Sequence, residues 1–326
     1  SKVMSTAKWP VSSIKPRYRV ITDNDYSGDP DGLVQLAHEL LSPSTETVAV
    51  IGTHLRIGDP WGASDDTPAE AVEAAQKVVD MCGLTGKVPV VKGAVPPLAD
   101  RKTPNDSAGV QAIIREAMRT DTDVPLFVVC GASLTEIASA WLIEPRIAER
   151  LTVVWIGGHE HAGLAEAPPE GTDMEYNLHI DPIAGQVVFN DSNLKIWQFA
   201  RDTYRQVMAS RAELYVRMRA HGELGRHLYD SLGQVSNLVA GFGMSTGEVY
   251  ILGDSPLVLA AALQASFQPD TASSKWVTKP CPNILDSGLY QENPAGRDLR
   301  VFTQVDSRLL LEDLYAKLEM HASGVR

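Results

Sequence analysis

The chain is predicted to be an α/β protein with a mostly parallel, open sheet and helices on both faces. Over the first two-thirds of its 326 residues, apolar runs of strand length alternate with segments of helical periodicity, which is the pattern of successive βα units. Most of these apolar runs are continuous and do not alternate with polar residues. Continuous runs are typical of parallel strands that helices cover on both sides.

Six strands are expected in this region, and a helix with clear boundary signals lies between the second and the third. Thr67 is suited to be its N-cap, Pro68 fits the first helical position and Glu70 completes a capping box. Gly83 lies just beyond the expected end of this helix. The predicted strands are residues 18–22, 46–51, 88–91, 126–129, 151–156 and 194–199.

After about residue 200 the alternation weakens, and helical periods such as 207–220 and 257–264 dominate. Pro and Gly cluster between residues 280 and 296. Because no Ser/Gly-rich linker separates this part from the first, we expect it to supply extra C-terminal helices that cap the same sheet. The chain is therefore predicted to form one domain over residues 1–326.

The composition argues against several classes of function. The chain has 29 Lys and Arg against 41 Asp and Glu, and its net charge of −12 argues against a nucleic acid or an anionic membrane as partner, since both usually require a basic face. A small neutral or cationic ligand fits this charge better. The three cysteines, Cys82, Cys130 and Cys281, are too few and too scattered for a disulfide framework or a zinc knuckle.

The sequence also bears on where the protein acts. No apolar run approaches the length of about 18 residues that a membrane span needs. The first five residues lack the apolar region of a signal peptide. We therefore expect a cytoplasmic protein, although a leader that had already been cleaved would leave no trace in this sequence.

The most informative segment is the turn after the first predicted strand, where Asp23, Asp25, Asp29 and Asp31 lie close together. Carboxylates held together in a folded site repel one another and raise each other's pKa. The group is therefore stable mainly when a hard divalent cation or a positively charged ligand compensates it. A solvated acidic loop is the alternative interpretation, because Asp, Ser, Gly and Pro are also ordinary turn residues.

Four segments between residues 18 and 260 carry a pattern of motifs in a fixed order. They are the acidic opening Asp23-Asn24-Asp25 through Asp31, the segment Val128-Val129-Cys130-Gly131-Ala132-Ser133-Leu134-Thr135 with the later turn Gly157-Gly158, the element Glu175-Tyr176-Asn177 with Asp181-Pro182, and Gly253-Asp254 ahead of a helix. Together they resemble the inosine-uridine nucleoside hydrolases. That family consists of calcium-dependent enzymes that cleave the N-glycosidic bond of ribonucleosides.

The resemblance implies Ca²⁺-dependent hydrolysis of a ribonucleoside to ribose and free base. Asp25 would be the general base that activates a calcium-bound water, because a bound ion lowers the pKa of that water. An oxygen-lined site also gives Ca²⁺ the six to eight ligands that it takes. The calcium ligands implied are Asp23, Asp25 and Asp254, with the carbonyl oxygen of Gly131. Asp29 and Asp31, in the longer acidic loop, are the further candidate ligands.

The resemblance also implies how a nucleoside is held. Glu175 and Asn177 would bind ribose hydroxyls. Apart from the resemblance, the loop residue Trp61 could stack on the base, or it could pack against its own domain as loop tryptophans commonly do. Further substrate contacts are expected from Asp31, His54 and Asp254. A small-molecule nucleoside is thus the expected ligand, and second copies of the chain are the expected protein partners, because the family tends to form homodimers or homotetramers.

Two departures from the family pattern affect this hypothesis. The family opening has paired aspartates, but here Gly32 follows Asp31, and a bidentate calcium ligand would be missing unless Asp29 or Asp31 replaces it. Many members carry a histidine just before the late aspartate, as the acid for the leaving base, and here that position is Gly253. The substitutes that follow predicted strand ends are His54, His159 and His161.

Two other functions stay open. A haloacid-dehalogenase-like phosphatase would use Asp23-x-Asp25 and the late Gly253-Asp254, but Val258 stands where its late motif needs a second acidic residue. A relative that binds nucleosides without hydrolysing them would also be consistent with Gly32 and Gly253.

Overall fold

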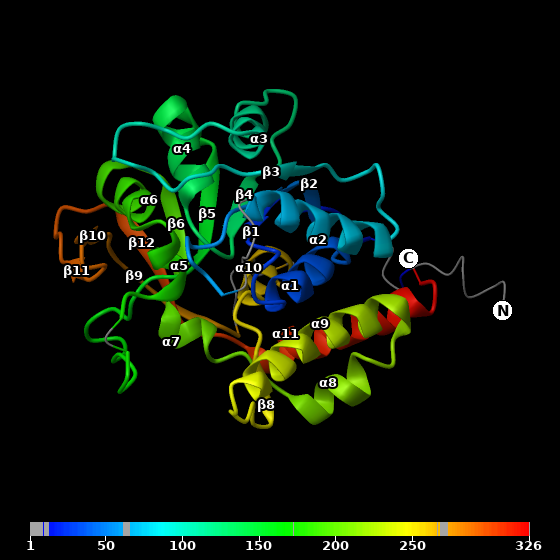
Figure 1. Ribbon diagram of the computed structural model, residues 1–326. Coiled ribbons are helices and arrows are strands. Elements are labelled where there is room, and N and C mark those ends of the chain that lie inside the picture. Colours follow the sequence, from blue (N-terminus) through cyan, green and yellow to red (C-terminus); the bar gives the residue numbers. More distant parts are fainter. Residues whose placement is uncertain are drawn as a thin grey trace.

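An eight-stranded sheet in the order β3-β2-β1-β4-β5-β6-β12-β9 forms the middle layer, and helices cover both of its faces (Figure 1). β1 to β6 and β12 run parallel, whereas β9 pairs antiparallel with β12 at one edge. The strands are β1 (Tyr18–Asn24), β2 (Thr45–Gly52), β3 (Val90–Lys92), β4 (Leu126–Cys130), β5 (Leu151–Ile156), β6 (Lys195–Phe199), β9 (Lys275–Pro280) and β12 (Asp298–Gln304). This computed structural model describes residues 9, 13–60, 66–171, 173–265, 267 and 273–325.

The predicted fold class is confirmed, and a strand forms at each of the six predicted positions. The continuous apolar runs have the expected cause, because successive side chains of one strand enter the cores on opposite faces of the sheet. Val20 packs in the core on one face and Ile21 in the core on the other. Val129 and Val128 of β4 divide in the same way.

The helices form two layers. α1, α2, α9, α10 and α11 pack on the Val20 face, and α3, α4 and α6 pack on the Ile21 face. Among the described residues, no helix is both long enough and apolar enough to cross a membrane. The helices are α1 (Asp31–Leu40), α2 (Thr67–Met81), α3 (Ala108–Ala117), α4 (Thr135–Ile143), α5 (Tyr176–Ile180), α6 (Pro182–Gln186), α7 (Arg201–Tyr204), α8 (Arg211–Arg217), α9 (Gly222–Gly241), α10 (Pro256–Ala262) and α11 (Ser307–Ala322).

The start of α2 differs from the prediction by one residue. Asp66 is the N-cap, and its carboxylate accepts a hydrogen bond from the backbone N–H of Ala69. Thr67 is instead the first helical residue. Its hydroxyl accepts a hydrogen bond from the N–H of Leu55, 3.1 Å away, and so fastens the loop after β2 to the helix.

The prediction for the region after residue 200 is partly wrong. Helices α8 to α11 supply the expected extra helices, but the helix expected over 207–220 is divided into β7 (Met208–Ser210) and α8. Two strands of the main sheet, β9 and β12, were not predicted at all. Arg300 interrupts the apolar pattern of β12. A charged residue is tolerated there because aromatic rings of two neighbouring strands cover its guanidinium, whose carbon lies 4.2 Å from the ring centroid of Trp197 and 4.4 Å from that of Trp276.

The order of the strands determines where a ligand can bind. From β1 the chain moves outward to β2 and β3, and it then returns to place β4 on the other side of β1. The turns after β1 and β4 therefore leave the sheet in opposite directions and open a crevice at its carboxyl edge. In open α/β sheets, ligands bind at this switch point.

Candidate active site

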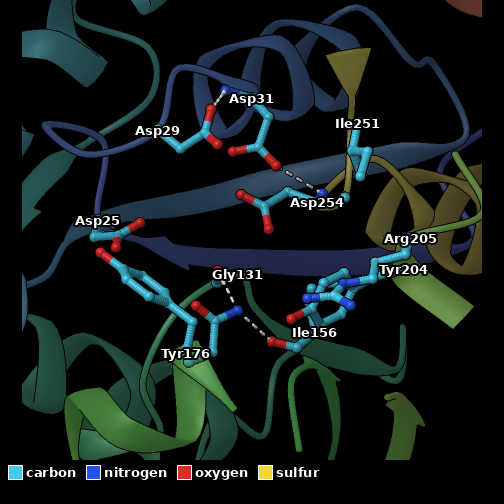
Figure 2. Close-up of a pocket in the computed structure, with 12 residues that line it drawn as sticks. Asp25, Asp29, Asp31, Gly131, Ile156, Tyr176, Tyr204, Arg205, Ile251 and Asp254 are labelled. Carbon is cyan, nitrogen blue, oxygen red and sulfur yellow. Dashed lines mark hydrogen bonds between the residues drawn. The ribbon is translucent and has the colours of Figure 1, made fainter. Parts of the chain in front are cut away.

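A pocket of about 290 Å³ opens at the carboxyl ends of β1, β4 and β5 (Figure 2). Asp25 follows the last residue of β1, Gly131 follows β4, and Ile156 ends β5. Asp254 reaches the same pocket from the segment between β8 (Val249–Ile251) and α10. The described residues that line the pocket are Asp25, Asp29, Asp31, Gly131, Ile156, Tyr176, Asn177, Tyr204, Arg205, Ile251, Gly253 and Asp254.

The acidic turn after β1 is held by hydrogen bonds to a segment more than 200 residues away. Asp29 accepts a hydrogen bond from the hydroxyl of Tyr250 at 2.7 Å and from the N–H of Asp31 at 3.1 Å. Asp31 in turn accepts one from the N–H of Asp254 at 3.1 Å. Each of these carboxylates keeps an oxygen outside these bonds, so the cluster can still bind a ligand.

Asn24, which the sequence analysis did not single out, connects the two acidic segments. Its side-chain amide donates to Asp254 at 3.0 Å, and its carbonyl oxygen accepts from the N–H of Asp25 at 2.8 Å. A Cβ at Gly32 would lie 3.0 Å from this amide nitrogen, and a Cβ at Gly131 only 2.2 Å from it. Both glycines therefore provide the space that Asn24 occupies.

The pKa values of the clustered carboxyls are shifted in the direction that crowding predicts. Burial raises the pKa of Asp25, and repulsion from Asp254 raises it further. The pKa of Asp31 is raised by burial and by the same neighbour. Burial also raises the pKa of Asp29, and it raises that of Asp254 to about 7. Without a compensating cation, the cluster therefore retains protons.

The donor set suits Ca²⁺ in its chemistry. Four carboxylates and the Gly131 carbonyl offer only oxygen atoms, which hard cations prefer, and their uncompensated charge favours a divalent ion. In the described part of the chain, no three Asp, Glu, His or Cys side chains are arranged as ligands of one ion. The pocket carboxylates therefore stand too far apart to share an ion in this arrangement. Ion binding at this cluster thus requires the side chains to converge further.

Asp23 is the predicted metal ligand that the structure does not bring to the pocket. The alternation of side chains along β1 would place Asp25 on the same side as Asp23, but β1 ends at Asn24. Asp25 therefore lies in the turn, where it lines the pocket. The Asp23 carboxyl is buried, and burial together with repulsion from Glu136 raises its pKa. Asp23 and Glu136 thus form a buried acidic pair that does not line the pocket.

The two predicted ribose-binding residues are placed differently. Asn177 lines the pocket, and its amide donates to the carbonyl oxygens of Gly131 at 3.1 Å and Ile156 at 2.6 Å. Glu175 is fully buried behind it and does not line the pocket. The Glu175 carboxylate caps α5 and also accepts hydrogen bonds from the N–H of Gly158 and the hydroxyl of Tyr204, each at 2.7 Å.

None of the three candidate histidines lines the pocket. His54 bonds the Thr135 hydroxyl at 3.0 Å. His159 accepts from the N–H of Glu175 at 3.1 Å. His161 bonds Gln198 at 2.7 Å and stacks on a tyrosine ring. The structure therefore does not bring these imidazoles to the position expected of an acid, and Trp61 lies outside the described residues.

The remaining wall is formed by Tyr204, which ends the short helix α7 after β6, and by Arg205, which follows it. A Cβ at Gly253 would lie 3.2 Å from the Tyr204 ring, so this ring fills the space beside the glycine. The sequence analysis missed both residues because neither lies in the acidic turn or in the four motif segments. The turn after β6 was the signal that could have identified them.

Hydrogen bonds to β12 and to the residue after it hold the segment that carries Tyr204 and Arg205. The hydroxyl of Thr203 donates to the carbonyl of Phe302 at 2.6 Å. The side chain of Gln206 donates to the carbonyl of Thr303 at 2.9 Å and accepts from the N–H of Val305 at 3.2 Å. The segment that carries Tyr204 and Arg205 is thereby attached to the strand on both sides.

Comparisons with known proteins point to one family. The family described as "Inosine-uridine preferring nucleoside hydrolase" matches residues 20–307. Two curated relatives bear the same description: one from Crithidia fasciculata is 29% identical over 203 residues, and one from Leishmania major is 27% identical over 197 residues. These matches cover 55% and 53% of this chain but only 58% and 57% of the relatives.

A solved plant nucleoside hydrolase has the same fold. It superposes with a TM-score of 0.70, and the match covers 93% of this chain and 99% of the plant chain. The sequence identity is 17%, so this similarity concerns the arrangement of the chain.

Proposed function

Because the chain belongs to the inosine-uridine preferring nucleoside hydrolase family, we propose that it hydrolyses the N-glycosidic bond of a ribonucleoside, giving ribose and the free base. One observation carries this proposal. Asp25, Asp31, Asp254, Gly131 and Asn177, which are far apart in the sequence, line one pocket at the switch point of the sheet. Membership of this family disfavours the phosphatase alternative.

Asp25 is the general base of the proposed reaction. Its carboxylate lines the pocket. Its backbone N–H donates to the Asn24 side chain, which fixes the backbone position from which the carboxylate extends. As water attacks the anomeric carbon, Asp25 takes the proton of that water. The nearby carboxylates stabilise the positive charge that develops on the sugar in an oxocarbenium-like transition state.

Asp25, Asp29, Asp31 and Asp254, with the carbonyl of Gly131, are the residues that would hold Ca²⁺. The bound ion would supply a compensating charge and would lower the pKa of water in the site. By lowering the pKa of the carboxyls as well, this charge would keep Asp25 ionised and able to accept a proton.

Ribose is oriented by the wall opposite the acidic turn. Asn177 lies beside Gly131, and because its amide N–H groups bond two carbonyls, its side-chain oxygen is the atom that accepts from sugar hydroxyls. Glu175 contributes indirectly: its carboxylate caps the short helix α5 and so helps to position Asn177. In the full assembly, two or four copies of the chain would each carry such a pocket.

A ribose-release assay with a panel of purine and pyrimidine nucleosides, with added Ca²⁺ or with a chelator, tests the proposed function. We expect hydrolysis that depends on Ca²⁺. Asp25→Asn should lower kcat by about 10²–10⁴-fold, because an amide cannot accept the proton of water. The exposed Asp80→Asn on α2 is the matched control and should leave kcat unchanged.

Two results would contradict the proposal. Near-normal kcat of Asp25→Asn would show that Asp25 is not the base. Tight nucleoside binding by the unmodified protein, measured by calorimetry without any release of ribose, would support the alternative of a binding protein that has lost hydrolysis.

A further inference from the structure

The wall of the pocket that faces Asp25 carries a positive charge. In Figure 2, Arg205 and Tyr204 lie on one side of the pocket and Asp25 lies on the other. Arg205 is the basic side chain among the described residues that line the pocket. Its guanidinium forms no salt bridge with any described carboxylate, so its charge is available to a ligand.

Neither of the two tyrosines that line the pocket is a good proton donor. The Tyr204 hydroxyl already donates to Glu175, and burial and this carboxylate raise the pKa of the phenol well above its usual value. The Tyr176 hydroxyl bonds Asp59, and burial with this bond raises its pKa as well. A base that leaves from this pocket must therefore depart without a full proton from either phenol.

We propose that Arg205 activates the leaving base by electrostatic stabilisation, a role that rests on the proposed hydrolysis. As the bond between the anomeric carbon and the base nitrogen breaks, its electron pair moves to the base. The water oxygen bonds to the carbon, and Asp25 takes the water proton. The base leaves as an anion paired with the guanidinium and afterwards takes a proton from solvent.

The positions of Asp25 and Arg205 suit these two roles. In a displacement at the anomeric carbon, the water enters on the face opposite the departing group. The residue that accepts the water proton and the residue that stabilises the leaving group must therefore stand on opposite sides of the sugar. Asp25 and Arg205 stand on opposite sides of the pocket (Figure 2).

The proposal predicts which substrates depend on Arg205. A base such as hypoxanthine leaves as a poorly stabilised anion and needs the guanidinium, whereas p-nitrophenolate is stable enough to leave without it. Removing a preorganised group that stabilises such a developing charge costs about 10²–10³-fold in kcat. Arg205→Gln should therefore lower kcat for inosine by about 10²-fold and change kcat for p-nitrophenyl riboside little.

The experiment measures kcat and KM for inosine and p-nitrophenyl riboside with the unmodified enzyme, Arg205→Gln, Arg205→Lys and the exposed control Arg146→Gln. Arg205→Lys keeps the positive charge and should recover much of the inosine rate. The control should behave as the unmodified enzyme. A series of ribosides should also show a steeper dependence of rate on leaving-group pKa in Arg205→Gln.

The outcomes separate this inference from the proposed function. Equal losses on both substrates, or no loss on inosine, would overturn the role of Arg205 while leaving hydrolysis established. If the unmodified protein releases ribose from neither substrate, the proposed function falls and the role of Arg205 falls with it.

Discussion

Asn24 illustrates how a residue without reactive chemistry can determine the geometry of a site. Its amide bonds Asp254 and its carbonyl bonds the N–H of Asp25, so one buried side chain fixes the distance between two acidic segments. The glycines at 32 and 131 leave room for it. At position 32, where the family pattern has a second aspartate, the space is thus taken by a neighbouring amide.

Gly131→Ala tests this dependence. The new Cβ would lie 2.2 Å from the Asn24 amide nitrogen, so the amide must leave its place, although the backbone carbonyl at 131 is kept. Small displacements of positioned groups can cost about 10²-fold in rate, and we expect a loss of kcat/KM of about this size. Gly233→Ala on α9, where nothing lies within 4 Å of the new Cβ, is the control and should keep full activity.

A double-mutant cycle identifies the cause of that loss. If Gly131→Ala acts by displacing Asn24, then Asn24→Ala combined with Gly131→Ala should cost little more than either substitution alone. Fully additive losses would show that the two residues act independently.

At the scale of residues, the sequence revealed the groups that are chemically unusual and missed those that matter by position. The clustered aspartates were identified because four carboxylates in one turn need an explanation. Arg205 could have been identified from its place in the turn after β6, because ligands bind at the carboxyl edge of such a sheet. Asn24 was not, because its bond to Asp254 joins residues 230 positions apart.

Among the elements, α1 carries an unusual buried acid that lies away from the pocket. Glu39 is fully buried, its carboxyl accepts a hydrogen bond from the Thr45 hydroxyl at 3.1 Å, and burial raises its pKa from 4.5 to about 7. The protonated form is thus favoured in the folded state. The stabilisation is complete below pH 4.5 and is lost as the pH rises through about 7.

Glu39→Gln isolates this effect. The amide is neutral at every pH, so the variant should gain stability relative to the unmodified protein between pH 5 and pH 8, by up to about 3 kcal/mol at 1.36 kcal/mol per pKa unit. Urea unfolding of both proteins at the two pH values measures the difference. Glu46→Gln, on an exposed position of β2, is the control. A difference that does not change with pH would contradict the prediction.

The accuracy of the element predictions follows from burial. β1, β2, β4 and β5 lie in the interior of the sheet, and their continuous apolar runs were readily recognised. β12 was missed because Arg300 occupies a position that looks exposed in the sequence and is covered by Trp197 and Trp276 only in the folded sheet. That cover depends on strands that are not adjacent in the chain.

At the scale of the whole molecule, the net charge of −12 and the raised pKa values in the pocket make the protein a candidate for stabilisation by cations. Ca²⁺ added to chelator-treated protein should raise Tm, since a ligand at 100 times its Kd stabilises by about 2.7 kcal/mol. The rise should be larger at pH 8 than at pH 5, because the ion must displace protons from the carboxyls.

Differential scanning calorimetry of the unmodified protein and of Asp254→Ala measures this effect. The variant removes one proposed ligand and should lose most of the rise in Tm. Mg²⁺ is the comparison ion, because it demands a more rigid octahedral shell. A calcium-independent Tm in both proteins, or an unchanged rise in Asp254→Ala, would argue against an ion at this cluster.

The attachment of the Arg205 wall to β12 has a consequence for how the protein is made. On the ribosome, the strands that carry Asp25 and Gly131 emerge early and can pair with each other while synthesis continues. Thr203 and Gln206 have to wait for about a hundred further residues before Phe302 and Thr303 become available to hold them. The acidic half also needs Tyr250 and Asp254, which are synthesised before β12, so it can be completed first. A nascent chain arrested between Asp254 and β12 would therefore carry the bonded carboxylates without the opposing wall.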